Sequence, residues 1–284
     1  MDIGASIFFT EYSISPTELG IALEERGFES LWVAEHSHIP ATRRFNVPTG
    51  GELERQYYDV MDPFVTLSAA AVATKRLKLA TGVCLVIQRD TIQTAKLVAS
   101  IDQVSNGRFL FGIGGGWNAE EMEDHGTVFK TRFKLMRERV EAMQAIWTQD
   151  AAEYHGDLVD FAPMAAWPKP VQKPHPPVIV GGAFPHSARR ALRYGDGWIP
   201  NASRPQYEDV TDFLPHFRQM AAEMGRDPAA VPVTVWGAGE DFDRLRRYQD
   251  QGIARVVVSL PPENAAKTLP ALDRWAELIR RIGR

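Results

Sequence analysis

The sequence predicts an α/β fold in which eight parallel strands close into a (β/α)8 TIM barrel surrounded by helices. Short apolar segments alternate with helical segments eight times along the 284 residues. Most of the short segments are continuous apolar runs, as expected of parallel strands buried on both faces. Alternation does not by itself prove closure, so an open doubly wound sheet is the alternative. We expect one domain, residues 1–284, and the chain contains no low-complexity tract.

The expected strands are short and mostly apolar, as the strands of a barrel core should be. They comprise residues 2–9, 30–34, 77–85, 108–113, 177–180, 197–199, 231–236 and 254–260. In a barrel or in an open sheet of this kind, the ligand site lies at the carboxyl ends of the strands.

Start and stop signals delimit the expected helices. Ser15-Pro-Thr-Glu18 has the pattern of a capping box, and the helix that it opens ends before Gly27. The segment 91–104 is amphipathic and stops at Asn106-Gly107. The other expected helices comprise residues 63–74, 131–147, 187–194, 207–224, 242–251 and 263–282.

Two connections are unusually long. About 27 residues separate the second strand from its helix, and a segment rich in proline and aromatic residues, 149–176, precedes the fifth strand. Connections of this length are usually functional. We expect both on the side of the barrel that carries the active site.

Bulk properties exclude several classes of function. A net charge of −4 gives no general attraction for nucleic acid or for an anionic membrane. The longest uncharged apolar stretch, 64–73, is far shorter than the roughly 18 residues of a membrane span. The start of the chain lacks a basic region, and a single cysteine excludes an internal disulfide framework. We expect a cytoplasmic protein with a small-molecule substrate and neither nucleic-acid nor membrane partners.

The fourth strand ends in the stretch FLFGIGGGWN, residues 109–118, which does not fit a dinucleotide-binding turn. The fingerprint G-x-G-x-x-G would begin at Gly112 and require glycine at position 117, which is Trp117. The helix that follows opens with acidic residues, which compete with a bound phosphate. These glycines therefore need another explanation, such as a bulky group held close to the backbone.

The fifth strand offers a better anion site. Gly181-Gly182 leads into a helix that begins near Ser187 and carries Arg189 and Arg190. A helix N-terminus that is free of acids, with a hydroxyl and two cations nearby, is suited to phosphate. The alternative is a surface helix capped by Ser187, with solvated arginines.

At this point a resemblance to a known family is apparent. Its motifs are WVAEH (32–36), QRDT (88–91), LVASIDQVSNG (97–107), GIGGGWNAEE (112–121) and RYGDGW (193–198), the last preceded by Gly181-Gly182. Over essentially its whole length, the chain resembles the bacterial-luciferase-like (β/α)8 oxidoreductases. It is most similar to the branch that uses the deazaflavin coenzyme F420.

The resemblance implies roles for individual residues. His36 looks like the histidine near the reactive deazaflavin ring, and Glu35 stands where relatives have an acid, so both are expected to be catalytic. Gly82-Val83 lies where relatives form a non-prolyl cis peptide bond against the ring. The substrate is expected to contact His38 and His125. The cofactor would contact Thr81, Gly82, Val83, Gly114, Gly115, Gly116, Asn118, Gly181, Gly182 and Ser187.

Two features, a histidine pair and the cysteine, have plain alternative explanations. His36-x-His38 also resembles the metal-binding pair of barrel hydrolases, but strand ends five, six and eight supply no further His or Asp ligand, so we expect no metal. Cys84 lies inside the third strand, which predicts a buried, inert thiol.

The resemblance implies a cytoplasmic oxidoreductase that moves a hydride between coenzyme F420 and a small organic substrate. The alternative is an FMN-dependent luciferase-like monooxygenase, which would activate oxygen in the same pocket. A non-catalytic barrel that binds a flavin or deazaflavin is a further alternative. The chain is short after the seventh strand, which argues against chemistry on long aldehydes. A homodimer is an assembly that we allow for.

Overall fold

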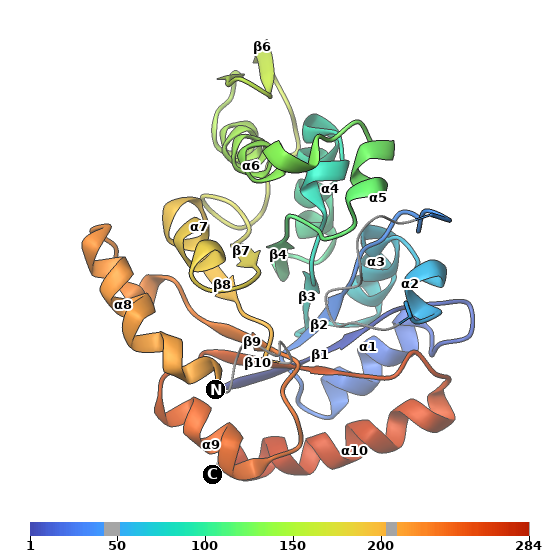
Figure 1. Cartoon of the computed structure of the whole chain (residues 1–284). Helices are drawn as coiled ribbons and strands as arrows, with labels where there is room; N and C mark the ends of the chain where they lie inside the picture. The colour runs from blue at the N-terminus through green and yellow to red at the C-terminus, as the bar shows by residue number, and fades with distance from the viewer. Residues whose placement is uncertain (43–51, 203–208, 284) are drawn as a thin grey trace.

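The computed structural model describes residues 1–42, 52–202 and 209–283 (Figure 1). Its centre is a sheet of eight strands, in which every neighbouring pair is parallel. The strands are β1 (Asp2–Ile7), β2 (Ser30–Val33), β3 (Lys78–Thr81), β4 (Phe109–Ile113), β7 (Val178–Gly181), β8 (Gly197–Ile199), β9 (Thr234–Trp236) and β10 (Arg255–Ser259). Each corresponds to a predicted strand.

The strand order shows that the sheet curls into a barrel. The order is β8-β7-β4-β3-β2-β1-β10-β9, and β1 lies in the interior of the sheet between β2 and β10. Isolated parallel bridges from Trp198 to Val233 and from Asn201 to Trp236 join the two outer strands. The barrel is therefore nearly closed, which confirms the predicted fold over the open sheet.

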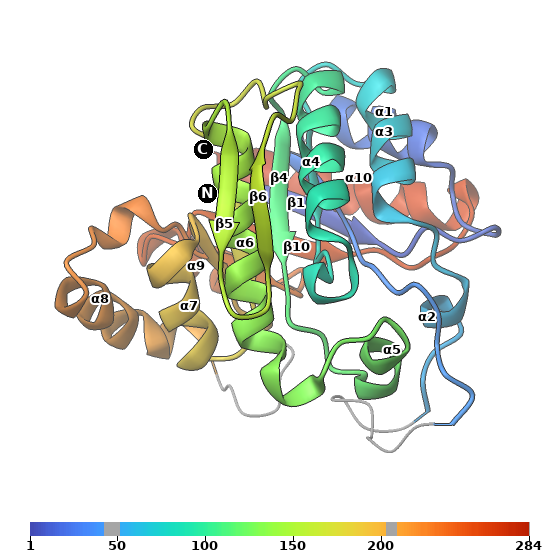
Figure 2. The same ribbon diagram turned by 90° about the horizontal axis from the view of Figure 1, so that it is seen from above.

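Helices surround the strands (Figures 1 and 2). Their starts carry the expected caps: Ser15 accepts from the backbone N–H of Glu18, and Asp90 accepts from that of Gln93. The predicted helix 207–224 begins at residues that lie outside the described ranges, and its described part is shorter. The helices are α1 (Pro16–Glu25), α3 (Pro63–Ala73), α4 (Thr91–Val104), α6 (Arg132–Thr148), α7 (His186–Tyr194), α8 (Leu214–Glu223), α9 (Phe242–Asp250) and α10 (Ala265–Ile282).

The prediction for the segment 149–176 was wrong. It forms an antiparallel hairpin of β5 (Ala152–His155) and β6 (Asp160–Met164), which lies along α6 in Figure 2. The backbone N–H of Leu158 donates to the Glu138 carboxylate on that helix at 2.7 Å. The segment is described throughout, and none of its residues lines the cavities discussed below. It follows a helix rather than a strand, so it starts at the end of the barrel opposite the site.

Two short helices lie among the connections at the other end. They are α2 (Gln56–Asp59), within the long connection after β2, and α5 (Ala119–Asp124), directly after the glycines of β4. In the part of the chain that the structure describes, no helix combines the length and the apolar character needed to cross a bilayer.

The barrel interior is filled by its own small core. Trp32 lies fully buried at its centre, and its indole N–H donates to Ser30 at 2.8 Å. A larger core lies between the strands and the helices. The interior core comprises Trp32, Ala80, Leu110, Ile179, Ile199 and Val257, with Val83 and Trp236 packed against it. Because side chains fill the barrel below, a ligand can be accommodated only at its mouth.

Candidate active site

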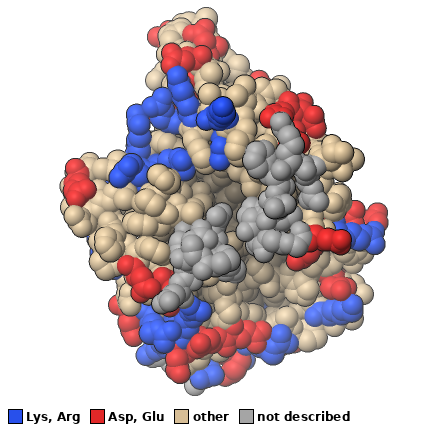
Figure 3. All heavy atoms as spheres, in the orientation of Figure 1, with Lys and Arg blue, Asp and Glu red and all other residues tan. Residues whose placement is uncertain are grey.

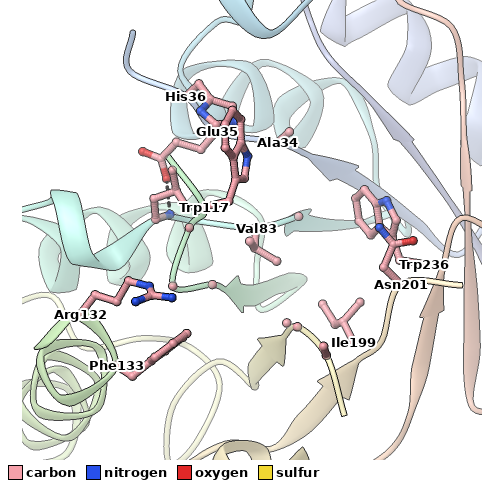
Figure 4. A pocket seen from close by; sticks show the side chains of 18 of the residues that line it. Ala34, Glu35, His36, Val83, Trp117, Arg132, Phe133, Ile199, Asn201 and Trp236 are labelled. Atoms are coloured by element: carbon pink, nitrogen blue, oxygen red, sulfur yellow. Dashed lines mark hydrogen bonds between the residues drawn. The ribbon is translucent and has the colours of Figure 1, made fainter. Parts of the chain in front are cut away.

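A cavity of about 590 Å³ opens at the carboxyl ends of the strands. In Figure 3 it corresponds to the hollow near the centre of the face, and Figure 4 shows its lining. Its position agrees with the strand-end site that the sequence predicted. The volume lies within the range of about 300–1,000 Å³ that is usual for small-molecule and cofactor pockets.

Glycines at the ends of β3, β4 and β7 form one wall of the cavity. Gly82 and Val83 are joined by a cis peptide bond, as the resemblance implied, and Val83 projects toward the middle of the cavity (Figure 4). A Cβ atom at Gly114 would lie 2.5 Å from the Val83 side chain, and one at Gly115 would lie 2.4 Å from Phe133. These glycines therefore make room for neighbouring side chains as well as for a ligand.

His36 lies just beyond β2 on the wall of the same cavity. Its ring is flanked by Tyr57 and Trp117, with centroid separations of 5.4 and 5.7 Å. Its Nδ1 lies 2.8 Å from Oε2 of Glu121 on α5, and the backbone N–H of Ser37 donates to Oε1 of the same carboxylate at 3.1 Å. An ionised carboxylate only accepts hydrogen bonds, so Nδ1 carries a hydrogen and Nε2 is left to exchange a proton.

Glu35, which the resemblance implied to be catalytic, is engaged by the protein itself. Its carboxylate accepts from the backbone N–H of Leu85 at 2.7 Å and from Nε of Arg89 at 2.5 Å. Burial alone would lower the pKa of Arg89, but the charge of Glu35 outweighs it, so the pKa is raised. Glu35 lines the cavity, yet both its oxygens bind protein donors. Glu121 takes the orienting role instead.

His38 and His125 lie together at the rim. The Ser37 hydroxyl is 2.9 Å from Nδ1 of His38 and 2.7 Å from Nε2 of His125. Asp124 contacts the other nitrogen of His38 at 2.9 Å. These contacts join the connection after β2 to α5, and neither histidine lines the cavity. Their contact with substrate stays a prediction.

The N-terminus of α7 differs from the expected anion site in one respect. The Ser187 hydroxyl is buried, donates to the carbonyl of Ala183 at 2.9 Å and accepts from the indole of Trp198 at 2.8 Å. It is therefore engaged within the protein. Gly181 and Gly182 do line the cavity, and so does Arg190 one turn further along the helix.

Two arginines bring positive charge to this end of the cavity. The Arg190 guanidinium lies 3.5 Å from the ring centroid of Phe133. The guanidinium of Arg132, on α6, lies 4.2 Å from the same centroid. Burial lowers the pKa of both arginines, and their mutual repulsion lowers that of Arg132 further. Within the described ranges, no ion pair is formed by either arginine. Two cations at one end of a cavity have the chemistry to bind an anion.

Three further residues lie away from the cavity. Thr81 is fully buried, and its hydroxyl donates to the carbonyl of Gly112 at 2.7 Å, joining β3 to β4. Asn118 is also buried, and its amide has no hydrogen-bond partner among the described residues. Neither lines the cavity, so their proposed cofactor contacts have no support from their positions.

Cys84 is fully buried, as predicted, and burial together with Glu35 raises its pKa well above the ordinary value.

A second, smaller cavity of about 300 Å³ adjoins the first. It is lined by residues of β1, the β10 end and the long connection after β2. The two cavities share Phe8, Ala34, Tyr57, Asn201 and Trp236.

Sequence reasoning missed several residues of the site. Glu121 belongs to the GIGGGWNAEE motif, but the acidic residues of this helix start were interpreted only as competing with a bound phosphate. Arg132 and Phe133 begin a long helix whose pattern gave no sign that its first turn faces a cavity. The missed residues are Phe8, Tyr57, Trp117, Glu121, Phe129, Arg132, Phe133 and Trp236.

Comparison with known proteins yields consistent matches. The family model described as luciferase-like monooxygenase matches residues 17–240. An uncharacterised protein of Mycobacterium tuberculosis is 36% identical over 282 residues, which cover 97% of this chain and 98% of that protein.

Two solved structures resemble the whole chain. The monooxygenase RslO1 from Streptomyces bottropensis has a TM-score of 0.81 at 20% identity and covers 100% of both chains. An F420-dependent secondary alcohol dehydrogenase, in complex with an F420-acetone adduct, has a TM-score of 0.77 at 18% identity and covers 99% of this chain and 98% of that one. At these identities the similarity shows the fold alone.

Proposed function

Because the chain belongs to the luciferase-like monooxygenase family, we propose that it is a cytoplasmic oxidoreductase that moves a hydride between coenzyme F420 and a small organic substrate. A deazaflavin has carbon in place of the flavin N5, so it supplies two-electron hydride chemistry and reacts poorly with oxygen. The protein must then hold the ring, exclude water and manage a proton.

The observation that carries the proposal is the pairing of His36 with buried Glu121 opposite a wall of glycines. Nε2 of His36 is left to give or take a proton in the cavity, and general acid–base catalysis of this kind is typically worth about 10²–10⁴-fold in rate. The backbone around Gly82, Gly114 and Gly181 would border the ring, with Val83 against its face.

The arginine pair would hold the cofactor's phosphate. Arg132 and Arg190 line the cavity with no counter-ion among the described residues, and the backbone of Gly181 and Gly182 lies beside them. Both guanidinium groups are half-buried and so have lost part of their hydration, and an anion that fills this position gains affinity by supplying the missing charge partner.

One feature favours coenzyme F420 over FMN. The connection between β9 and α9 comprises only residues 237–241, so the long insertion of luciferase subunits is missing there. An FMN-dependent monooxygenase is the second candidate, because the monooxygenase RslO1 shares the fold along its full length, as the F420-dependent dehydrogenase does.

Titration of the purified full-length protein with coenzyme F420 and with FMN tests the proposal. We expect micromolar or tighter binding of coenzyme F420 and much weaker binding of FMN. Arg190→Gln should weaken F420 binding at least about tenfold, the cost of one charged hydrogen bond to phosphate. Arg189→Gln is the matched control, because Arg189 is exposed on the same helix and does not line the cavity. Stoichiometric FMN carried through purification would reverse the ranking of the two cofactors.

A further inference from the structure

The rim of the barrel is divided into two chemically different halves. At the ends of the adjacent strands β3, β4 and β7, the residues that line the main cavity include Gly82, Gly114 and Gly181. On the adjacent strands β1 and β10, Ser6 and Ser259 line the second cavity. Glycine leaves space for a flat ring, whereas hydroxyl groups bind a polar ligand.

Hydrogen-bonding groups surround the second cavity. Ser6 and Ser259 are partners in the β1–β10 register, and their hydroxyl oxygens lie 3.5 Å apart. Glu54 and Gln56, on the connection after β2, line the same cavity, and the Gln56 amide donates to the Glu54 carboxylate. A volume of about 300 Å³ is at the small end of the range for ligand pockets.

The second cavity leads directly to the catalytic histidine of the proposed site. Tyr57 lines both cavities, and its ring centroid lies 5.4 Å from that of His36. Burial, and then the charge of Glu54, raise the pKa of Tyr57, so its phenol stays neutral and can donate a hydrogen bond. A molecule in the second cavity would therefore have one end beside His36.

Charge is also divided between the two cavities. Of the described residues that line the second cavity, Glu54 alone carries a charge, and it is negative. The cations lie elsewhere: in Figure 4, Arg132 is on the side of the main cavity opposite Trp236 and Asn201, which border the second. A carboxylate or phosphate in the second cavity would meet Glu54, with no compensating cation among the described residues that line it.

We propose that the second cavity is the substrate subsite and that it takes a small, neutral molecule carrying several hydroxyl groups, in preference to a carboxylate or a phosphate. This inference rests on the proposed function, because it assumes that the main cavity holds the cofactor. Ser6, Ser259 and the Glu54 carboxylate bind the hydroxyl groups, and the reacting carbon lies where the two cavities meet.

The test uses two probes of matched size, erythritol and its carboxylate counterpart erythronate. Each is titrated into the full-length protein, without and with coenzyme F420, and followed by amide shifts in NMR spectra. We expect erythritol to bind with shifts centred on Ser6, Ala34, Gly237 and Leu260, and erythronate to bind at least about tenfold more weakly. Ser6→Ala should weaken erythritol binding about two- to tenfold, the range for one hydrogen bond. Ser100→Ala on α4, outside the barrel, is the matched control.

Glu54→Gln tests the charge separately. In a folded variant, we expect the ratio of the erythritol affinity to the erythronate affinity to fall at least about threefold. Equal binding of the two probes, or shifts confined to other residues, would overturn the inference. If erythritol binds as expected but coenzyme F420 does not, the subsite stands and the proposed function fails. If coenzyme F420 binds and erythritol does not, the proposed function stands and the substrate-subsite inference fails.

Discussion

At the scale of single residues, the carboxylate of Glu121 serves two donors at once. It accepts from Nδ1 of His36 and from the backbone N–H of Ser37, and its side chain is completely buried. A glutamine of the same shape offers one acceptor oxygen and one donor group, so it cannot satisfy both. The hydrogen on Nδ1 therefore depends on the charge at position 121 and not only on its shape.

We predict that Glu121→Gln changes the tautomer of His36. In ¹⁵N NMR spectra of the imidazole, the wild type should show hydrogen on Nδ1, and the variant should show a mixture of the two tautomers. Turnover should fall at least about tenfold, and His36→Asn should lower it at least about 10²-fold with little change in F420 affinity. Glu123→Gln, on the exposed side of α5, is the control.

The two readouts separate the possible failures. An unchanged tautomer in Glu121→Gln would show that another group orients His36. A changed tautomer with unchanged turnover would show that His36 takes no part in proton transfer, and the proton donor would then be sought among other groups at the cavity.

Single residues also show where sequence reasoning reached its limit. His36 and the glycine wall were predicted because they follow strands, and strand ends meet at the barrel mouth. Glu35 and Ser187 were assigned by position alone. In the structure Arg89 donates to Glu35 and Trp198 donates to Ser187, and no local sequence pattern reveals either contact. Contacts between distant segments are set by the closed barrel.

At the scale of elements, Arg108 ties the end of α3 to the start of β4. Its guanidinium donates to the carbonyls of Ala71 and Thr74 at 2.8 and 3.1 Å, and to that of Leu77 at 2.5 Å. The last carbonyls of a helix have no partner within the helix, so these bonds cap α3. Burial lowers the pKa of Arg108, and no carboxylate is paired with it in the described chain.

We predict that Arg108→Lys destabilises the protein by about 2 kcal/mol, because an ammonium group cannot reach all of these carbonyls in the fixed geometry of the guanidinium. Chemical denaturation monitored by circular dichroism measures the change. Arg246→Lys, at an exposed position of α9, should change the free energy of unfolding by less than about 0.5 kcal/mol. Equal stability of the two variants would contradict the capping role.

The elements that were predicted well have start and end signals in their own sequence. The helix α4 was predicted at its observed bounds, because Asp90 caps its start and Asn106-Gly107, both with positive φ, follow its end. The hairpin β5–β6 was missed, because its strands are short and largely exposed, and only β5 alternates between buried and exposed residues. Its contacts with Glu138 and Glu141 of α6 hold it in place, and these are tertiary contacts.

At the scale of the whole molecule, a buried ion pair lies at the end of the barrel opposite the site. Arg255 on β10 donates to both oxygens of Glu29 at 2.7 and 2.6 Å, and Lys78 on β3 lies 2.8 Å from the same carboxylate. Burial alone would raise the pKa of Glu29, but the Arg255 hydrogen bonds and charge outweigh it and lower the pKa to about 2. Stability and catalysis thus depend on opposite ends of the barrel.

We predict that Glu29→Gln lowers the free energy of unfolding by about 3 kcal/mol at pH 7 and leaves F420 binding unchanged. The folded-state pKa is lower than the unfolded one, so the contribution to stability is complete above the ordinary pKa of 4.5 and is lost as the pH falls toward 2. The difference between wild type and variant in urea denaturation should therefore shrink over that interval.

An exposed carboxylate provides the contrast for this experiment. Glu277 pairs with Arg280 on the surface of α10, where Glu277→Gln should cost less than about 1 kcal/mol. A wild-type advantage over Glu29→Gln that stays constant down to pH 2 would contradict the assigned pKa.

The buried state of Cys84 makes the chain convenient for site-specific dye attachment. Maleimides react with thiolates, and the only cysteine of the chain is inaccessible and has a raised pKa. Val128 is 61% exposed and precedes Phe129, which lines the main cavity. A Val128→Cys variant would carry one reactive thiol without removal of the native one. A fluorophore attached there would sit beside the mouth of the barrel and report directly when a ligand enters.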